Sequence, residues 1–152
     1  MNAEDIIRYA RDMKNNWNTN DPYEIANRLG IEVLHRDNHI KGFTAQTLKL
    51  DGYPTIISIN NAYTDFSKKL LCAHELGHAL LHENCVNHFA NTSSNVLSNV
   101  EKEANLFAIA LLTDYDIDEN LSIPLARMNN YLLKAIMDYN IRLEENKVQK
   151  SS

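Results

Sequence analysis

Apolar residues recur at helical spacing in the first twenty positions of the chain. The stripe lies on one side of a helix and consists of Ile6, Ile7, Ala10, Met13 and Trp17. We expect a helix from about Ala3 to Asn16, with Asn2 as its N-cap. A second, short helix is predicted after Asp21-Pro22, which supply an N-cap and a proline at the first helical position, and it should end at Leu29-Gly30.

Three runs typical of β-strands follow, at Ile31 to Arg36, Gly42 to Leu48 and Pro54 to Asn60. The third run is apolar enough to lie inside a sheet, and Asp51-Gly52 marks a turn before it. We therefore predict an α+β fold, in which a small three-stranded antiparallel sheet packs with its helices on one face.

The segment that contains Leu70 to Leu81 is predicted to form a helix that begins between Thr64 and Ser67 and ends near Glu83. Leucines and alanines surround much of its circumference, so it should be central and largely buried. Gly77 inside this helix costs about 1 kcal/mol relative to alanine, which indicates close approach of another backbone or of a substrate.

The remainder of the chain is predicted to be helical after a polar interruption. Residues 84–99 are rich in Asn and Ser and are interpreted as a loop or a lid. One helix is expected from about Val100 to Leu112 and a last one from near Pro124 to Leu143. We predict a single domain over residues 1–143 and a flexible C-terminal tail over 144–152.

Composition narrows the class of protein. The 152 residues carry 15 Lys and Arg against 20 Asp and Glu, a net charge of −5, which argues against direct binding to nucleic acid. No stretch approaches the roughly 18 apolar residues of a membrane span, and the N-terminus lacks the pattern of a secretory signal. Two cysteines, Cys72 and Cys85, are too few for a disulfide scaffold. We expect a cytoplasmic protein whose partners are proteins.

His74-Glu75-Leu76-Gly77-His78 is the sequence motif with the clearest chemistry. Residues four apart on a helix lie one above the other, so both imidazoles can reach one metal ion. Glu75 projects beside them and can take a proton from a water molecule. The pattern predicts a zinc site of the kind found in metallopeptidases.

A catalytic zinc site needs a third protein ligand. The metzincin extension would require Gly at 81 and His at 84, but the chain has Leu81 and Asn84. Glu101 and Glu103, at the start of the following helix, are the candidates. We predict Glu103, because it lies one turn before Phe107 on the apolar side, whereas Glu101 is offset from it by about 200°.

Other donors remain open. His82, Cys85 and His88 could form a separate structural site resembling a zinc finger. Beyond the metal, a donor for an oxyanion is not identifiable, and Tyr63 and His82 are weak candidates.

Similarity to a known family lies in Ala73 to His78, in Glu101 to Ala108 with Leu111-Leu112, and in the segments 21–30 and 41–43. In these residues the chain resembles the ImmA/IrrE family of metallopeptidases. The chain departs from the family pattern at Thr113-Asp114, where Met-Pro is usual, and at Lys69, where arginine is common.

The resemblance implies that a zincin-like helical core binds Zn²⁺ through His74, His78 and Glu103, with Glu75 as the catalytic base. It also implies a substrate, since such enzymes are often encoded on prophages and conjugative elements and cleave a helix-turn-helix repressor, which releases transcription. The competing hypothesis is a non-catalytic zinc-binding anti-repressor that sequesters its partner. The intact Glu75 argues against it, because binding a metal needs only the ligands.

Overall fold

The computed structural model describes residues 1–37, 44–82, 88–89 and 99–113. The helices are α1 (Ala3–Trp17), α2 (Pro22–Arg28), α3 (Asp65–Leu81) and α4 (Asn99–Leu112), and the strands are β1 (Glu32–Arg36), β2 (Ala45–Leu48), β3 (Ile56–Asn60) and β4 (His88–Phe89). The α+β class is confirmed.

The two N-terminal helices begin where their N-cap residues predict, and α2 ends before the predicted glycine. The Asn2 side chain accepts a hydrogen bond from the backbone N–H of Asp5 at 2.8 Å, and Asp21 accepts one from Tyr23 at 3.0 Å. After α2, Gly30 has a φ of +76°, a left-handed conformation in which glycine avoids the strain of a Cβ atom. Capping residues therefore set these boundaries, as expected.

The sheet differs from the predicted three-stranded antiparallel sheet. The described strands take the order β1-β3-β2-β4, in which β1 pairs in parallel with β3 and the other pairs are antiparallel. The sheet is thus mixed, and the prediction of three antiparallel strands was wrong. The strand β4 lies within the segment interpreted as a loop.

The central position of β3 explains this strand order. A turn at Leu50 to Tyr53, with Gly52 at a φ of +81°, folds β3 back on β2. Residues 57–60 of β3 are all buried, and a strand with this apolar pattern gains most when neighbours flank it on both sides. β1 therefore pairs with the side of β3 that β2 leaves open, and not with β2.

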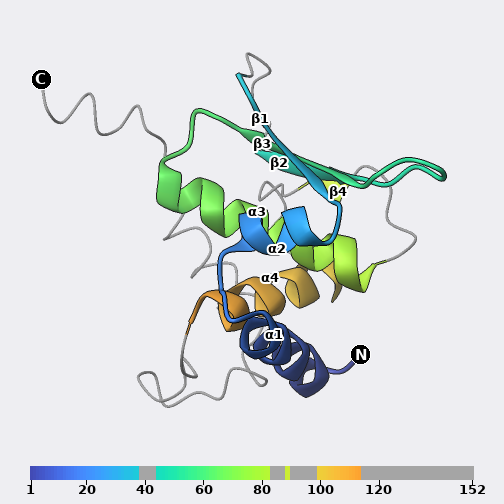
Figure 1. Cartoon of the computed structure of the whole chain (residues 1–152), viewed down its shortest axis with the longest axis vertical. Helices are drawn as coiled ribbons and strands as arrows, with labels where there is room; N and C mark the ends of the chain where they lie inside the picture. The colour runs from blue at the N-terminus through green and yellow to red at the C-terminus, as the bar shows by residue number, and fades with distance from the viewer. Residues whose placement is uncertain (38–43, 83–87, 90–98, 114–152) are drawn as a thin grey trace, which may run out of the picture.

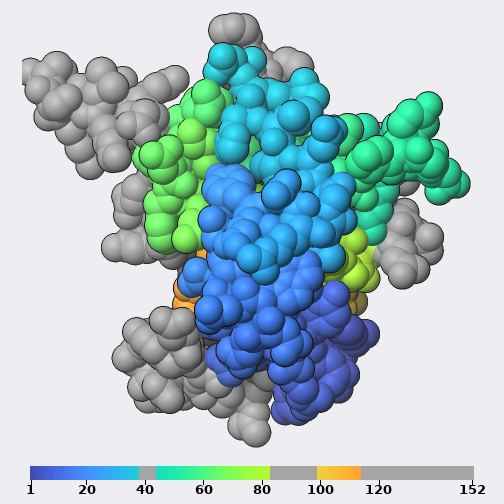
Figure 2. Space-filling view, in the orientation of Figure 1, coloured from blue at the N-terminus to red at the C-terminus, as the bar shows by residue number. Residues whose placement is uncertain are grey.

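The described helices lie on one side of the sheet (Figure 1). α3 packs between the sheet and α4, α2 contacts both β1 and α3, and α1 packs on the far side of α4. The space-filling view shows α1, α2 and β1 on one face, with the turn between β2 and β3 projecting to the side (Figure 2). This layering makes α3 the central helix, as its apolar circumference predicted.

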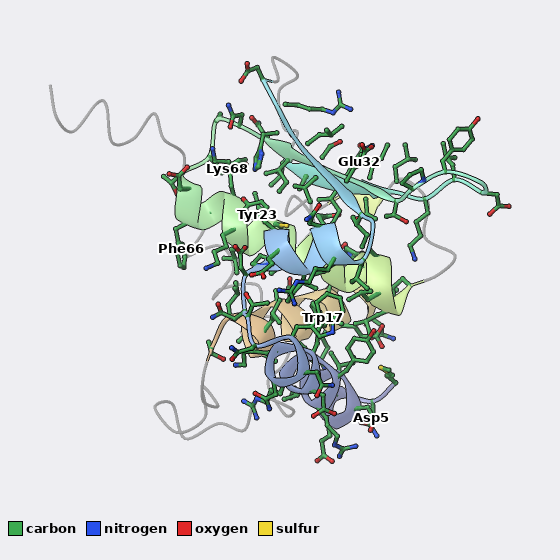
Figure 3. All side chains as sticks on the ribbon, in the orientation of Figure 1. Asp5, Trp17, Tyr23, Glu32, Phe66 and Lys68 are labelled. Carbon is green, nitrogen blue, oxygen red and sulfur yellow. The ribbon has the colours of Figure 1, made fainter. Side chains whose placement is uncertain are left out.

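The first turn of α3 is anchored to the end of β3. Thr64 caps the helix by accepting a hydrogen bond from the backbone N–H of Ser67 at 3.2 Å. The Lys68 ammonium donates to Asn61 Oδ1 at 2.9 Å, whereas the exposed Phe66 side chain points away from the sheet (Figure 3). This anchor sets where along the sheet the second half of α3 falls.

The predicted helix from Pro124 to Leu143, the tail over 144–152 and Cys85 lie outside the described residues. The domain limits therefore stay a prediction. Among the described helices, none is long and apolar enough to cross a membrane.

Candidate metal centre

The second half of α3 carries the two motif histidines into the interior. His74 and His78 lie one turn apart, with 2% and 0% of their surfaces exposed. Their rings meet edge to face, with centroids 4.8 Å apart. Burial of two imidazoles on one helix face is costly unless hydrogen bonds or a metal satisfy the ring nitrogens.

Gly77 brings α4 against this part of α3. A Cβ atom at Gly77 would lie 3.2 Å from Ala104 Cα and 3.3 Å from the Ala104 carbonyl oxygen. The close approach predicted from the glycine is therefore confirmed, and the approaching backbone is that of α4. It places the start of α4 beside the histidines.

Glu101 of α4 faces both histidines. One carboxylate oxygen, Oε1, lies 3.0 Å from His78 Nε2, and the other, Oε2, lies 3.0 Å from His74 Nε2. One donor atom from each of the three residues falls within 4.8 Å of the others. His74, His78 and Glu101 thus form a cluster that could hold a metal ion.

Glu103, the ligand predicted from the sequence, lies elsewhere. Its Oε1 is 2.7 Å from His82 Nε2, one turn beyond His78 on α3. The prediction took Phe107 as the marker of the inward side. Its Cβ atom does lie against Gly77 of α3, but its ring packs against Tyr9 of α1. The side of α4 that faces α3 is better marked by Ala104, which is one turn from Glu101. The structure therefore brings Glu101, not Glu103, to the two histidines.

Glu75 is buried beside this cluster. Its Oε1 accepts a hydrogen bond from the Thr47 hydroxyl of β2 at 2.7 Å, and its Oε2 lies 3.8 Å from His74 Nε2. Oε2 has no hydrogen-bond partner among the described residues. One oxygen is thus held by the sheet, and the other is available to accept a proton.

Burial shapes the acidity of Glu75. The pKa of this carboxyl is raised to about 7, because removal from water outweighs the nearby His74 and the hydrogen bond from Thr47, which both lower it. A base whose pKa lies near neutrality can both take and return a proton at physiological pH. Sequence reasoning found Glu75, but it missed Thr47, which no motif marks.

The Glu101 carboxylate and the histidines shift each other's pKa in opposite directions. Burial raises the pKa of Glu101, but His74 and His78 outweigh it and hold this pKa well below its usual range. Burial lowers the pKa of His74, but the Glu101 and Glu75 carboxylates outweigh it and raise this pKa. The site thus keeps Glu101 ionised and favours positive charge between the carboxylates.

This environment fits a divalent metal ion. Both ring nitrogens of His74 are buried and lack a hydrogen-bond partner among the described residues, although Nε2 lies near Glu101. Two imidazoles and one carboxylate form a donor set typical of catalytic zinc. A cation would give His74 Nε2 the partner that it lacks and would neutralise the carboxylate charge.

The alternative roles of His82 and Tyr63 receive no support. His82 has Nδ1 3.0 Å from His78 Nδ1 and Nε2 next to Glu103, so both ring nitrogens are engaged. The Tyr63 hydroxyl is paired with Thr44 Oγ1 at 3.3 Å. Tyr63 precedes the first residue of α3, whereas His78 lies near the other end of that helix. The finger-like site needs Cys85, which lies outside the described residues.

The candidate ligands thus lie on two packed helices, α3 and α4, as expected for a metallopeptidase. The chain belongs to the peptidase M78 family, because the model of its IrrE N-terminal-like domain matches residues 26–122, more than half of the chain. This match confirms the resemblance to the ImmA/IrrE family and covers the whole cluster.

The chain is also similar to the uncharacterized immunity region protein 2 of Bacillus phage phi105. The two are 36% identical over 101 residues, which cover 63% of this chain and 60% of the phage protein. The chain thus matches less than two thirds of the length of this relative. No solved structure matches the chain.

Proposed function

We propose that this protein is a zinc-dependent endopeptidase that holds Zn²⁺ with His74, His78 and Glu101. The observation that carries the proposal is the position of the Glu101 carboxylate, whose two oxygens each lie 3.0 Å from the Nε2 atom of a motif histidine. Three converging donors in a buried site, next to a fourth residue suited to proton transfer, favour hydrolysis over a structural metal site.

Each residue of the site then has a distinct task. Bound zinc would lower the pKa of a water molecule and polarise the scissile carbonyl. Glu75 takes the proton of the attacking water on its Oε2 and returns it to the leaving amine. Thr47 holds the other Glu75 oxygen at 2.7 Å, so the carboxylate keeps one orientation throughout.

For the substrate, we propose a helix-turn-helix transcriptional repressor, whose cleavage would induce genes of a mobile element or a stress response. Support comes from the family and from the phage relative, which is named for an immunity region. The net charge of −5 also favours action on a protein over direct contact with DNA. We expect cleavage in a linker or locally unfolded segment, because a peptidase must receive an extended chain.

The test is incubation of the zinc-loaded protein with a candidate helix-turn-helix repressor, followed by mass spectrometry of the fragments. Glu75→Gln is the matched control, since it keeps the three proposed ligands and should leave the repressor intact. If the wild-type protein binds the repressor and lifts it from its operator without cutting it, the non-catalytic anti-repressor is the correct alternative. If there is neither binding nor cleavage, the proposed substrate is wrong.

A further inference from the structure

A chain of three side chains extends from the candidate metal ligand His78 towards the surface. His78 Nδ1 lies 3.0 Å from His82 Nδ1, and His82 Nε2 lies 2.7 Å from Glu103 Oε1. The two imidazoles are almost fully buried, whereas the Glu103 side chain is 30% exposed. The proposed chemistry of the site uses neither His82 nor Glu103.

The carboxylate of Glu103 fixes which nitrogen donates and which accepts in this series of side chains. An ionised carboxylate only accepts hydrogen bonds, so His82 must carry a hydrogen on Nε2 to pair with Glu103. A neutral His82 then has a lone pair on Nδ1. The facing His78 Nδ1 must therefore carry the hydrogen of that contact, which leaves the lone pair of His78 on Nε2.

His78 Nε2 is the atom that faces the candidate metal site, 3.0 Å from Glu101. A count of hydrogens supports this assignment. The series from Glu101 through His78 and His82 to Glu103 contains three contacts, and each contact needs one hydrogen. Two neutral imidazole rings carry only two N–H hydrogens. A metal ion at His78 Nε2 takes the place of the third, so every contact is satisfied without charging either ring.

We infer that His82 and Glu103 are positioning residues, which hold His78 in the tautomer that presents Nε2 to the metal. The inference rests on the proposed function, since it assigns a role to residues around the same site. It also explains why two glutamates begin α4: Glu101 serves the metal directly, and Glu103 acts through His82. Partners of this kind on a ligand histidine typically contribute a factor of about 10 to 100 in metal affinity.

Zinc affinity, measured by competition with a chromophoric chelator, tests the inference. We expect Glu103→Gln to weaken binding by about 10-fold or more, because a neutral amide accepts more weakly than a carboxylate and can equally donate to His82 Nε2, so it no longer fixes the two tautomers. Lys102→Gln, on the same turn of α4, is the matched control and should bind zinc as the wild type does. The melting temperatures of the zinc-free proteins show whether Glu103→Gln leaves the fold intact.

A double-mutant cycle separates positioning from simple packing. If Glu103 acts through His82, Glu103→Gln should have no further effect on zinc affinity in a His82→Phe background. Additive losses would contradict this relay, in which Glu103 acts on His78 through His82. The ¹⁵N shifts of the zinc-loaded wild-type protein give an independent reading, in which His82 should be the Nε2–H tautomer.

The outcomes distinguish the relay from the site itself. A wild-type protein that binds no zinc overturns the proposed function. A wild-type protein that binds zinc, with unchanged affinity in Glu103→Gln or with His82 as the Nδ1–H tautomer, overturns only the relay.

Discussion

Gly77 of α3 and Ala104 of α4 touch backbone to backbone, and this contact aligns the histidines on one helix with the glutamates on the other. A Cβ atom added to Gly77 would lie 3.2 Å from Ala104 Cα, a contact that neither backbone can relieve by a change of rotamer. The two backbones would have to move apart by a few tenths of an ångström. Glycine at this position therefore permits the close approach, despite its cost within a helix.

We predict that Gly77→Ala lowers both stability and zinc affinity. Alanine gains about 1 kcal/mol of helix propensity, but overpacking at a close backbone contact costs about 1–3 kcal/mol, so over most of this range the net effect is a loss. Separation of the helices would also move Glu101 away from the histidines. Chemical denaturation and chelator competition measure the two effects. A variant that is more stable and binds zinc as tightly as the wild type would show that α4 yields freely.

A second prediction assigns the third ligand. Glu101→Ala should lose zinc, because its carboxylate faces both motif histidines, whereas Glu103→Ala should retain a weakened site. In the wild type, zinc at about 1,000 times its dissociation constant would stabilise the fold by about 4 kcal/mol. Removal of zinc by a chelator should then lower the melting temperature by roughly 10 °C. Metal analysis that finds full zinc in Glu101→Ala would contradict this assignment.

The sequence predicted the helices and the motif because these depend on neighbours in the chain. Caps at Asn2, Asp21 and Thr64 act within three residues, and the spacing of His74 and His78 follows from one helical turn. These signals needed no knowledge of the tertiary fold.

The third ligand and the strand order depend on packing between distant segments. α4 is buried on nearly every side from Ala104 to Leu111, so its apolar residues do not reveal which side faces α3. The missed signal was Ala104, because its small side chain marks the place where α4 meets Gly77 in a close helix contact. Likewise, the pairing of β1 with β3 depends on which strand the hairpin leaves exposed.

A third prediction concerns the base. Glu75→Gln should retain zinc and fold, yet lose about 10²- to 10⁴-fold in hydrolysis, because an amide cannot take a proton from water at neutral pH. The amide of this variant can still accept the Thr47 hydrogen bond through its carbonyl oxygen, so the orientation of the side chain is preserved. Cleavage of the identified substrate at the wild-type rate would exclude Glu75 as the base.

A fourth prediction links Glu75 to the stability of the zinc-free protein. Since the folded pKa is about 7 and the ordinary value is 4.5, the folded state holds a proton that the unfolded state releases between these pH values. Stability therefore falls as pH rises through this window. The difference between the two pKa values corresponds to a loss of about 3 kcal/mol in stability across this window. Glu75→Gln removes this pH-dependent contribution.

The effect is measured by denaturation of the zinc-free wild type and of zinc-free Glu75→Gln. The two pH values are about 5 and about 8, which together span most of this window. The stability of the variant minus that of the wild type should be larger at the higher pH than at the lower pH. His74, whose raised pKa also makes stability fall with rising pH, is present in both proteins. The Glu75 carboxylate contributes to that raised pKa, so its loss in Glu75→Gln weakens the pH dependence from His74 and acts in the same direction. An equal stability difference at the two pH values would show that the folded pKa of Glu75 is not raised.

The last prediction concerns Thr47, whose hydroxyl donates to Glu75 Oε1 at 2.7 Å and lowers the pKa of that carboxyl. Thr47→Val keeps the shape of the side chain and removes the donor, so the pKa of Glu75 should rise by about one unit. Because Glu75 acts as a base only when ionised, the acid limb of kcat/KM should move to higher pH. Thr47→Ser retains the hydroxyl and should keep the wild-type profile, which separates loss of the donor from loss of packing. If valine and serine shift the limb equally, the hydrogen bond has no part in setting the acidity of the base.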